Sequence, residues 1–308
     1  MRTTLEHLSF EQKNELTIII KKIIAAIAVD QIICYGSRIK NNYHWSCSAL
    51  DSCNKFYSSA AIDLLIIPAK QEARSSHDII QAVTTYNTPA LSIFCIVHHE
   101  PFVSDAIMQG HQFFVTLHKS GYQLYGNSRE TIALKAKENS VQTRLQTAEF
   151  IWESIFRRAQ DYLKGAGFYL QNNATNPTGF LLHQAIEQTA IALLRALTSY
   201  RPDSHNLSRL LPLMEHAGLC INNIFPQNTE QEKELFSILK RSYSDTRYTD
   251  DFHIPPATAQ ILYTRTDELM KQAKTIYLHE TSKWREQIEK HDNPPLNIAY
   301  LNPLHNAS

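Results

Sequence analysis

A short polar sequence between two apolar runs could bind a phosphate group and a metal ion. Gly36 and Ser37 follow the first run, and Asp63 stands at the start of the second. Glycine lets the backbone approach a ligand closely, and the next hydroxyl and amide can hold a phosphate oxygen. A carboxylate at the mouth of a buried strand can hold a divalent cation that bridges phosphates. We therefore predict a phosphate site at Gly36, Ser37 and Arg38 and a metal ligand at Asp63.

The elements that must position these residues are two buried strands. The apolar runs 31–35 and 62–67 are short and bounded by polar or small residues, as buried strands are. We expect the strands to be joined at a Gly-Ser turn, followed by a polar insert at 38–60. A third strand is expected at 91–97, and a helix or helix pair precedes the first strand. Long loops beside a site are often functional, so the insert is a candidate part of the site.

This arrangement resembles the nucleotidyltransferase fold of the polymerase-beta type. The resemblance rests on Gly36-Ser37 and on Asp63, which matches the second acid of an Asp-x-Asp motif, whereas position 61 is alanine. It implies transfer of a nucleoside monophosphate from a nucleoside triphosphate, with Mg²⁺, to a small molecule, RNA or protein. In this resemblance Gly36, Ser37 and Arg38 would bind the nucleotide, and Asp63 would be a catalytic residue and metal ligand. Such chemistry generally uses two metal ions held by two or three carboxylates. Ala61 therefore favours a domain that keeps the fold and nucleotide binding over an active transferase.

Other metal ligands are less well placed in the sequence. Additional acids could come from Glu100 after the third strand, from Asp51 in the insert, or from Asp105. A separate zinc site is an alternative for the insert, although its spacing matches no common site and a fourth ligand is not evident. Its three ligands would be His44, Cys47 and Cys53.

After about residue 138 the pattern is helical only. Apolar residues recur at helical spacing and the loops are short, which favours an antiparallel bundle. We expect helices at about 140–171, 178–199, 206–217, 230–248 and 257–289.

Three motifs in this region resemble the HEPN domain, a helical bundle often fused or paired with the nucleotidyltransferase fold. They are Leu-His-Gln-Ala-x-Glu at 182–187, Pro-x-Ser-His-Asn-Leu at 202–207 and Arg-Tyr at 247–248. One interpretation of the polar residues is a structural network between helices, for example at a dimer interface. Alternatively they form a nucleotide or acceptor pocket in which Arg201, His205 and Arg247 bind phosphate.

A ribonuclease site is a third hypothesis. Many HEPN proteins cleave RNA with an Arg followed, after four to six residues, by a His, and five residues separate Arg247 from His253. Histidine would act as acid or base on the ribose hydroxyl, and arginine would stabilise the charge developing on the phosphate. Tyr248 departs from the small polar residue that usually follows this Arg.

Composition limits the classes of protein to which this chain can belong. The 30 Lys and Arg residues balance 30 Asp and Glu residues, so a non-specific nucleic-acid binder is not expected. The apolar segments are too short to span a bilayer, and five cysteines favour a cytoplasmic, reducing compartment.

We predict an α+β nucleotidyltransferase-like domain with a mixed sheet at 1–127, a linker at 128–139, an all-α HEPN-like antiparallel bundle at 140–290 and a loosely ordered tail at 291–308. A homodimer through the helical domain is the expected assembly.

Overall fold

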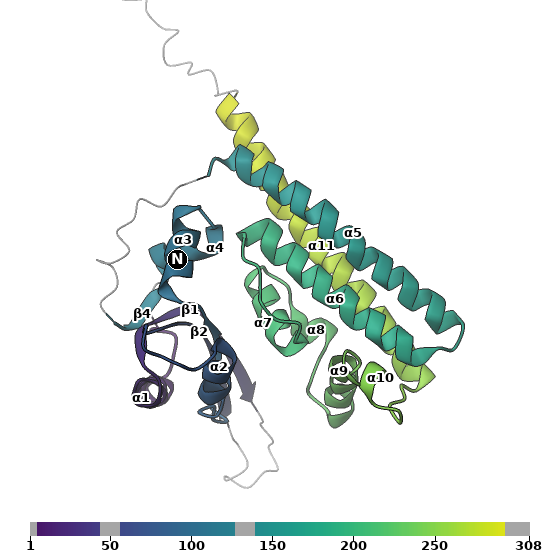
Figure 1. Ribbon diagram of the computed structural model, residues 1–308, viewed down its shortest axis with the longest axis horizontal. Coiled ribbons are helices and arrows are strands. Elements are labelled where there is room, and N and C mark those ends of the chain that lie inside the picture. The colour runs from purple at the N-terminus through teal and green to yellow at the C-terminus, as the bar shows by residue number, and fades with distance from the viewer. Residues whose placement is uncertain (1–4, 44–55, 127–138, 293–308) are drawn as a thin grey trace, which may run out of the picture. The chain divides into compact units, whose positions relative to one another are not determined.

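A computed structural model of the chain describes residues 5–43, 56–126 and 139–292. The chain divides into two compact units, 1–138 and 139–308, which are described separately below (Figure 1). The zinc ligands predicted in the insert and Asp51 lie outside the described residues.

The N-terminal unit is built on one mixed sheet with the strand order β3-β2-β1-β4. Strand β1 pairs antiparallel with both β2 and β4, and β2 pairs parallel with β3. This confirms the predicted fold class of an α+β domain with a mixed sheet. Its elements are α1 (Phe10–Ala26), β1 (Val29–Tyr43), β2 (Phe56–Pro68), α2 (Ser76–Thr84), β3 (Leu91–Val97), α3 (Glu100–Met108), α4 (Gln112–Ser120) and β4 (Tyr122–Tyr125).

The predicted turn at Gly36-Ser37 is wrong. Both residues lie inside β1, which continues to Tyr43 and pairs with β2 from Phe56 onward. A register shift between Cys34 and Gly36 marks a bulge, where glycine is often found. Residues 38–43 and 56–60 of the predicted polar insert therefore belong to the paired strands β1 and β2.

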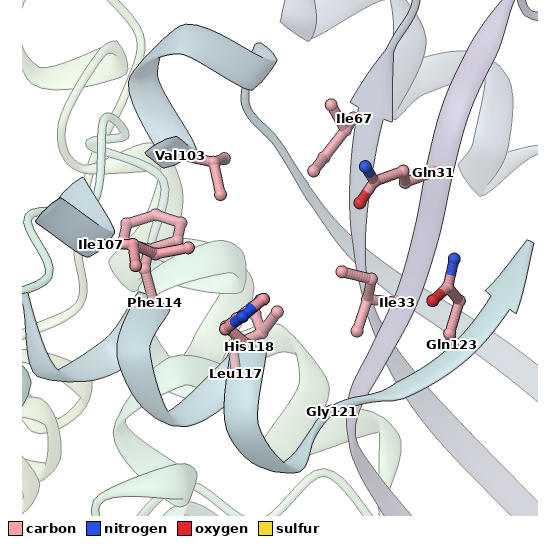
Figure 2. Close-up of a pocket in the computed structure, with 10 residues that line it drawn as sticks. All are labelled: Gln31, Ile33, Ile67, Val103, Ile107, Phe114, Leu117, His118, Gly121 and Gln123. Carbon is pink, nitrogen blue, oxygen red and sulfur yellow. The ribbon is translucent and has the colours of Figure 1, made fainter. Parts of the chain in front are cut away.

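The two faces of the sheet have different surroundings. Ile62, Leu64 and Ile66 of β2 pack in a core with α1 and α2. The residues between them point the other way because side chains alternate along a strand. On that second face, Ile67 lies near side chains of α3 and α4, such as Val103 and Phe114 (Figures 1 and 2).

The C-terminal unit is a helical bundle, as predicted. Its helices are α5 (Val141–Gln171), α6 (Thr175–Thr198), α7 (Leu207–His216), α8 (Ile221–Ile224), α9 (Glu230–Arg241), α10 (Asp245–Tyr248) and α11 (Pro256–Asp292). Helices α5, α6 and α11 pack side by side along a shared apolar core (Figure 1). Helix α6 also contacts α7, α9 and α10, so its polar residues are surrounded by other helices.

The predicted helix at 230–248 is interrupted. Helix α9 ends at Arg241, and α10 starts only at Asp245. The intervening Ser242 is fully buried and donates a hydrogen bond to the carbonyl of Ile238 at 2.7 Å. The interruption matters because it places Tyr243 against α6.

Candidate functional site

Asp63 lies in the interior of the N-terminal domain. Its side chain is 0% exposed, and Nη2 of Arg38 donates to its Oδ1 at 2.7 Å. Gly36 is its register partner on β1, and Arg38 pairs with the next position on the same face, Ala61. The structure therefore brings Arg38 and Asp63 together as an ion pair in which the carboxylate is buried and the guanidinium is partly exposed.

Ser37 belongs to the opposite face of the sheet. It pairs with Ile62, whose side chain is in the core beneath α1 and α2. Its hydroxyl lies 2.6 Å from Nε2 of His7, a residue that precedes α1. Because neighbouring residues of a strand face opposite sides, the Ser37 hydroxyl and the Asp63 carboxylate do not converge on one phosphate.

A second carboxylate for Asp63 is not found among the described residues. Asp63 pairs with Phe94 on β3, whereas Glu100 lies beyond the strand's last residue, Val97, which is ~10 Å further along at the usual rise of a strand. The Oε1 of Glu100 instead accepts a hydrogen bond from the Ser104 hydroxyl at 2.6 Å. No group of three or more His, Cys, Asp or Glu side chains that could hold a metal occurs in the described ranges.

These observations bear on the magnesium site that the sequence suggests. The best-placed carboxylate, Asp63, already binds a guanidinium, and two-metal chemistry needs at least one further acid. Asp105 lies within α3 and does not supply it. The described residues therefore do not fit a two-metal centre at Asp63.

The thiol of Cys34, next to this ion pair on β1, lies in an apolar part of the sheet. Burial raises the pKa of Cys34 to about 11, and the negative charge of Asp63 raises it further. The Sγ of Cys34 donates to the Gly36 carbonyl at 3.3 Å, which also favours the protonated thiol. A thiol with such a pKa is inert at neutral pH.

A small cavity lies nearby on the second face of the sheet (Figure 2). Its volume is 20 Å³, and Gln31, His118 and Gln123 contribute polar groups to an otherwise apolar lining. Within the described part of the chain, the buried Oε1 of Gln31 has no hydrogen-bond partner. A space of this size suits a single water molecule and is far too small for a nucleotide.

The helical bundle contains a second candidate site, centred on Glu187 of α6. Its carboxylate is 3% exposed and lies 2.8 Å from Nδ1 of His205, whose side chain is 69% exposed. Because an ionised carboxylate only accepts hydrogen bonds, Nδ1 carries the proton and donates it. Gln184 and Gln188 donate longer bonds, at 3.4 and 3.5 Å, to the same carboxylate. Glu187 thus fixes the orientation of His205 and leaves its Nε2 atom available for a ligand.

Tyr243 joins this pair to α10. Its ring stacks on His205 with 6.0 Å between centroids, and on His183 with 5.0 Å. The guanidinium of Arg247 lies 4.4 Å from the same ring, and its Nε donates to the Tyr243 carbonyl at 2.9 Å. We call His183, Glu187, His205 and Tyr243 the His–Glu cluster.

His183 is the buried member of the His–Glu cluster. It is 2% exposed, and burial, followed by the charges of His205 and Arg247, lowers its pKa to about 4. Its Nδ1 atom has no hydrogen-bond partner in the described ranges of the chain. His183 is therefore neutral at pH 7, with a polar atom that nothing in these ranges satisfies.

A groove of about 460 Å³ opens beside the His–Glu cluster, a volume within the ~300–1,000 Å³ range of small-molecule sites. We call it the α7 groove, because residues at the start of α7 form one wall and residues from the end of α9 form the other. It is lined by His183, His205, Asn206, Leu207, Ser208, Ser237, Lys240, Arg241, Tyr243 and Ser244.

Charge in the α7 groove is mainly positive. Lys240 and Arg241 come from the last turn of α9 on one wall, and the N-terminus of α7, the positive end of its dipole, lies on the other wall. Arg241 is partly neutralised by Glu234 at 3.0 Å and Asp245 at 3.9 Å. An anion is the ligand that this combination favours.

The other predicted residues of the bundle lie apart from the α7 groove. The charge of Arg201 acts on Arg195, whose pKa is lowered first by burial and then by Arg201. His253 is exposed between the buried Phe252 and Ile254, where the Asn176 side chain bonds the backbone of both neighbours at 2.5 and 3.0 Å.

Among the residues the structure describes, no hydrogen bond joins His253 to Arg247, and the ribonuclease hypothesis stays a prediction. Sequence reasoning identified His205 and Arg247 but missed His183, Tyr243, Lys240 and Arg241. For His183, the sequence signal that points to the site is its spacing from Glu187, which places the two residues one turn apart on α6.

The fold and site define an α+β domain followed by a helical bundle with a His–Glu cluster. Residues 152–280 match the family model of the HEPN domain, so the bundle is a HEPN domain, as its motifs predict. A nucleotidyltransferase-like protein from Exiguobacterium sibiricum aligns with 94% of this chain and 83% of its own at 12% identity, with a TM-score of 0.25, too low to carry an argument about the fold. No curated protein matches the chain. None of the described helices is both long and apolar enough to cross a membrane.

Proposed function

We propose that this protein binds a nucleotide in its HEPN domain, with the phosphate group in the α7 groove. The observation that carries the proposal is the hydrogen bond between the buried Glu187 and the exposed His205 at 2.8 Å. A buried carboxylate that orients an exposed imidazole is an arrangement that fixes a ligand-binding nitrogen in place. A HEPN domain also indicates a nucleotide-related function in general.

The groups around His205 suit a phosphate. Lys240 supplies a compact positive charge, Arg241 supplies planar donors, and the first turn of α7 supplies a favourable dipole. His205 donates from Nε2 when it is protonated and accepts there when it is neutral. Charge-assisted hydrogen bonds of this kind are about twice as strong as neutral ones.

The N-terminal domain has a different role in this proposal. The buried pair of Arg38 and Asp63, and the lack of a second carboxylate among the described residues, favour a catalytically reduced module over an active nucleotidyltransferase. We propose that this domain regulates or supports the HEPN domain. Cys34 and Cys220 form no disulfide bond among the described residues, which suits the cytoplasm proposed as the compartment.

Calorimetry with the full-length protein tests nucleotide binding. The four nucleoside triphosphates are titrated into wild type, His205→Ala, Lys240→Met and a control, His279→Ala, whose histidine is exposed on α11. We expect binding by wild type and the control, and a loss of about tenfold or more in each groove variant, since each removes a charged or charge-assisted contact. Thermal shifts should rise with nucleotide concentration, because the ligand binds the native state. Absence of binding at millimolar nucleotide, or equal binding by all four proteins, would contradict the proposal.

A further inference from the structure

His183 is a buried polar side chain whose Nδ1 atom is not satisfied by the described residues of the bundle. It is 2% exposed, it lines the α7 groove, and its Nδ1 atom has no partner in the portion of the chain that the structure describes. Leaving a buried polar atom unsatisfied costs about 1–3 kcal/mol. A hydrophobic residue at this point of α6 would avoid that cost, so the imidazole needs an explanation.

The charge state of His183 limits what it can bind. Burial, followed by the electrostatic effects of His205 and Arg247, lowers its pKa to about 4, so the ring is neutral at pH 7. A neutral imidazole offers one donor and one acceptor and adds no charge to a phosphate site. Lys240 and Arg241 already supply positive charge in the same groove. His183 is therefore suited to an uncharged hydrogen-bonding group.

We infer that His183 makes the α7 groove selective for nucleoside phosphates over inorganic phosphates, by hydrogen bonding to the ribose or the base. This inference rests on the proposed function, in which the groove binds phosphate. The ligand is thus a phosphate ester with an uncharged polar group close to the anion. His183 is a specificity-determining residue in this assignment.

Tyr243 controls access to His183. Its ring covers the imidazole at 5.0 Å and belongs to the short segment between α9 and α10. The ring is partly exposed, and it also contacts the exposed His205 and Arg247. A rotation of this one side chain brings a ligand from the groove to His183. A flat ring at this position also offers a stacking surface to a nucleobase, which a bare phosphate cannot use.

A charge-matched pair of ligands tests the inference. Each nucleoside triphosphate and inorganic tripolyphosphate are titrated into the full-length protein at pH 7.5, and affinities are compared for wild type, His183→Phe, His183→Gln and the control His279→Gln. We expect at least one nucleotide to bind wild type about tenfold more tightly than tripolyphosphate, the usual scale for one hydrogen bond inside a groove. His183→Phe should bind that nucleotide no better than tripolyphosphate, with tripolyphosphate binding unchanged. His183→Gln should retain part of the preference.

Each result has a distinct meaning. If wild type binds neither ligand, the proposed function fails. If it binds both equally, or if His183→Phe weakens both by the same factor, the inference about His183 is overturned while the phosphate site stands. If circular dichroism shows that His183→Phe does not fold, His183→Gln is compared with wild type instead, together with nitrogen-15 NMR of the wild-type His183 ring. The inference is contradicted if His183→Gln keeps the full preference for the nucleotide and the ring resonance does not shift when nucleotide is added.

Discussion

Nδ1 of His205 lies 2.8 Å from Oε1 of Glu187, and this contact joins an exposed ring to a carboxylate that is almost completely buried. Glu187 lies in the middle of α6, the helix that contacts most of the bundle. His205 is in the segment just before α7. The contact therefore fixes both the α6–α7 connection and the direction in which the imidazole faces the α7 groove.

Coupling between these two residues should be measurable. In a double-mutant cycle with Glu187→Gln and His205→Asn, we expect a coupling energy of about 1 kcal/mol, because the interaction is charge-assisted but one partner is exposed. Urea denaturation of the four proteins gives the free energies of unfolding. A coupling energy below about 0.3 kcal/mol, the usual scatter for independent sites, would mean that the contact does not hold His205 in solution.

The buried His183 should make stability depend on pH. Its folded pKa is about 4, and that of an unfolded histidine is near 6.5. As pH falls, the unfolded chain binds the proton first, so the stabilisation is complete above pH 6.5 and is lost between pH 6.5 and 4.

Over this window wild type should lose up to about 3 kcal/mol more stability than His183→Gln, which has nothing to protonate at this position. Unfolding by urea at pH 7.0, 6.0, 5.0 and 4.5 measures the difference. Parallel curves for the two proteins would show that His183 is not buried in the neutral form.

The Arg38–Asp63 pair predicts a stability defect that a second substitution repairs. Arg38→Met leaves the charge of Asp63 buried without this partner and should cost about 2–4 kcal/mol, somewhat less than a fully buried pair because Arg38 is 31% exposed. Adding Asp63→Asn removes the charge and should restore most of the loss. Thermal or chemical unfolding tests this, and a harmless Arg38→Met would show that Asp63 does not depend on the arginine.

Two glycines of the bundle give a matched test of packing beside the His–Glu cluster. A Cβ on Gly179 of α6 would overlap Cδ1 of Ile254 and lie 2.7 Å from Oγ of the buried Ser242. A Cβ on Gly165 of α5 meets only the tip of Leu181 at 3.1 Å.

Gly179→Ala should therefore destabilise the protein by about 1–3 kcal/mol, whereas Gly165→Ala should be neutral or stabilise it by up to about 1 kcal/mol through helix propensity. Circular dichroism melts of both variants check the prediction. Equal effects would indicate that α6 does not pack against Ser242 and Ile254 as described.

The periodicity of apolar residues predicts most of the helices and strands, because each of them buries an apolar face whose residues recur at a fixed spacing. The 31–35 and 62–67 runs are strands, and the long helices α5 and α11 were recognised from their helical spacing. Periodicity did not show that β1 continues past Gly36, since the polar residues after it have no apolar alternation. Tertiary pairing with β2, which no local pattern reveals, extends that strand.

The candidate site was harder to predict from the sequence. The sequence predicts Ser37 and Asp63 at one site because the expected turn would place them together, but a continuous strand puts them on opposite faces. His183 and Tyr243 were missed because their significance depends on packing. Only the break after α9 brings Tyr243 over His183, and a serine-rich segment within a helical pattern does not predict such a contact.

Nucleotide binding at the His–Glu cluster is the central claim, and histidine NMR tests it most directly. Protein labelled with nitrogen-15 at histidine is titrated with nucleoside triphosphates at pH 7.5. Resonances of His205 and His183 should shift in a saturable way, while that of His279 on α11 stays unchanged. Shifts confined to His7 beside Ser37, or no shift at millimolar nucleotide, would contradict the account.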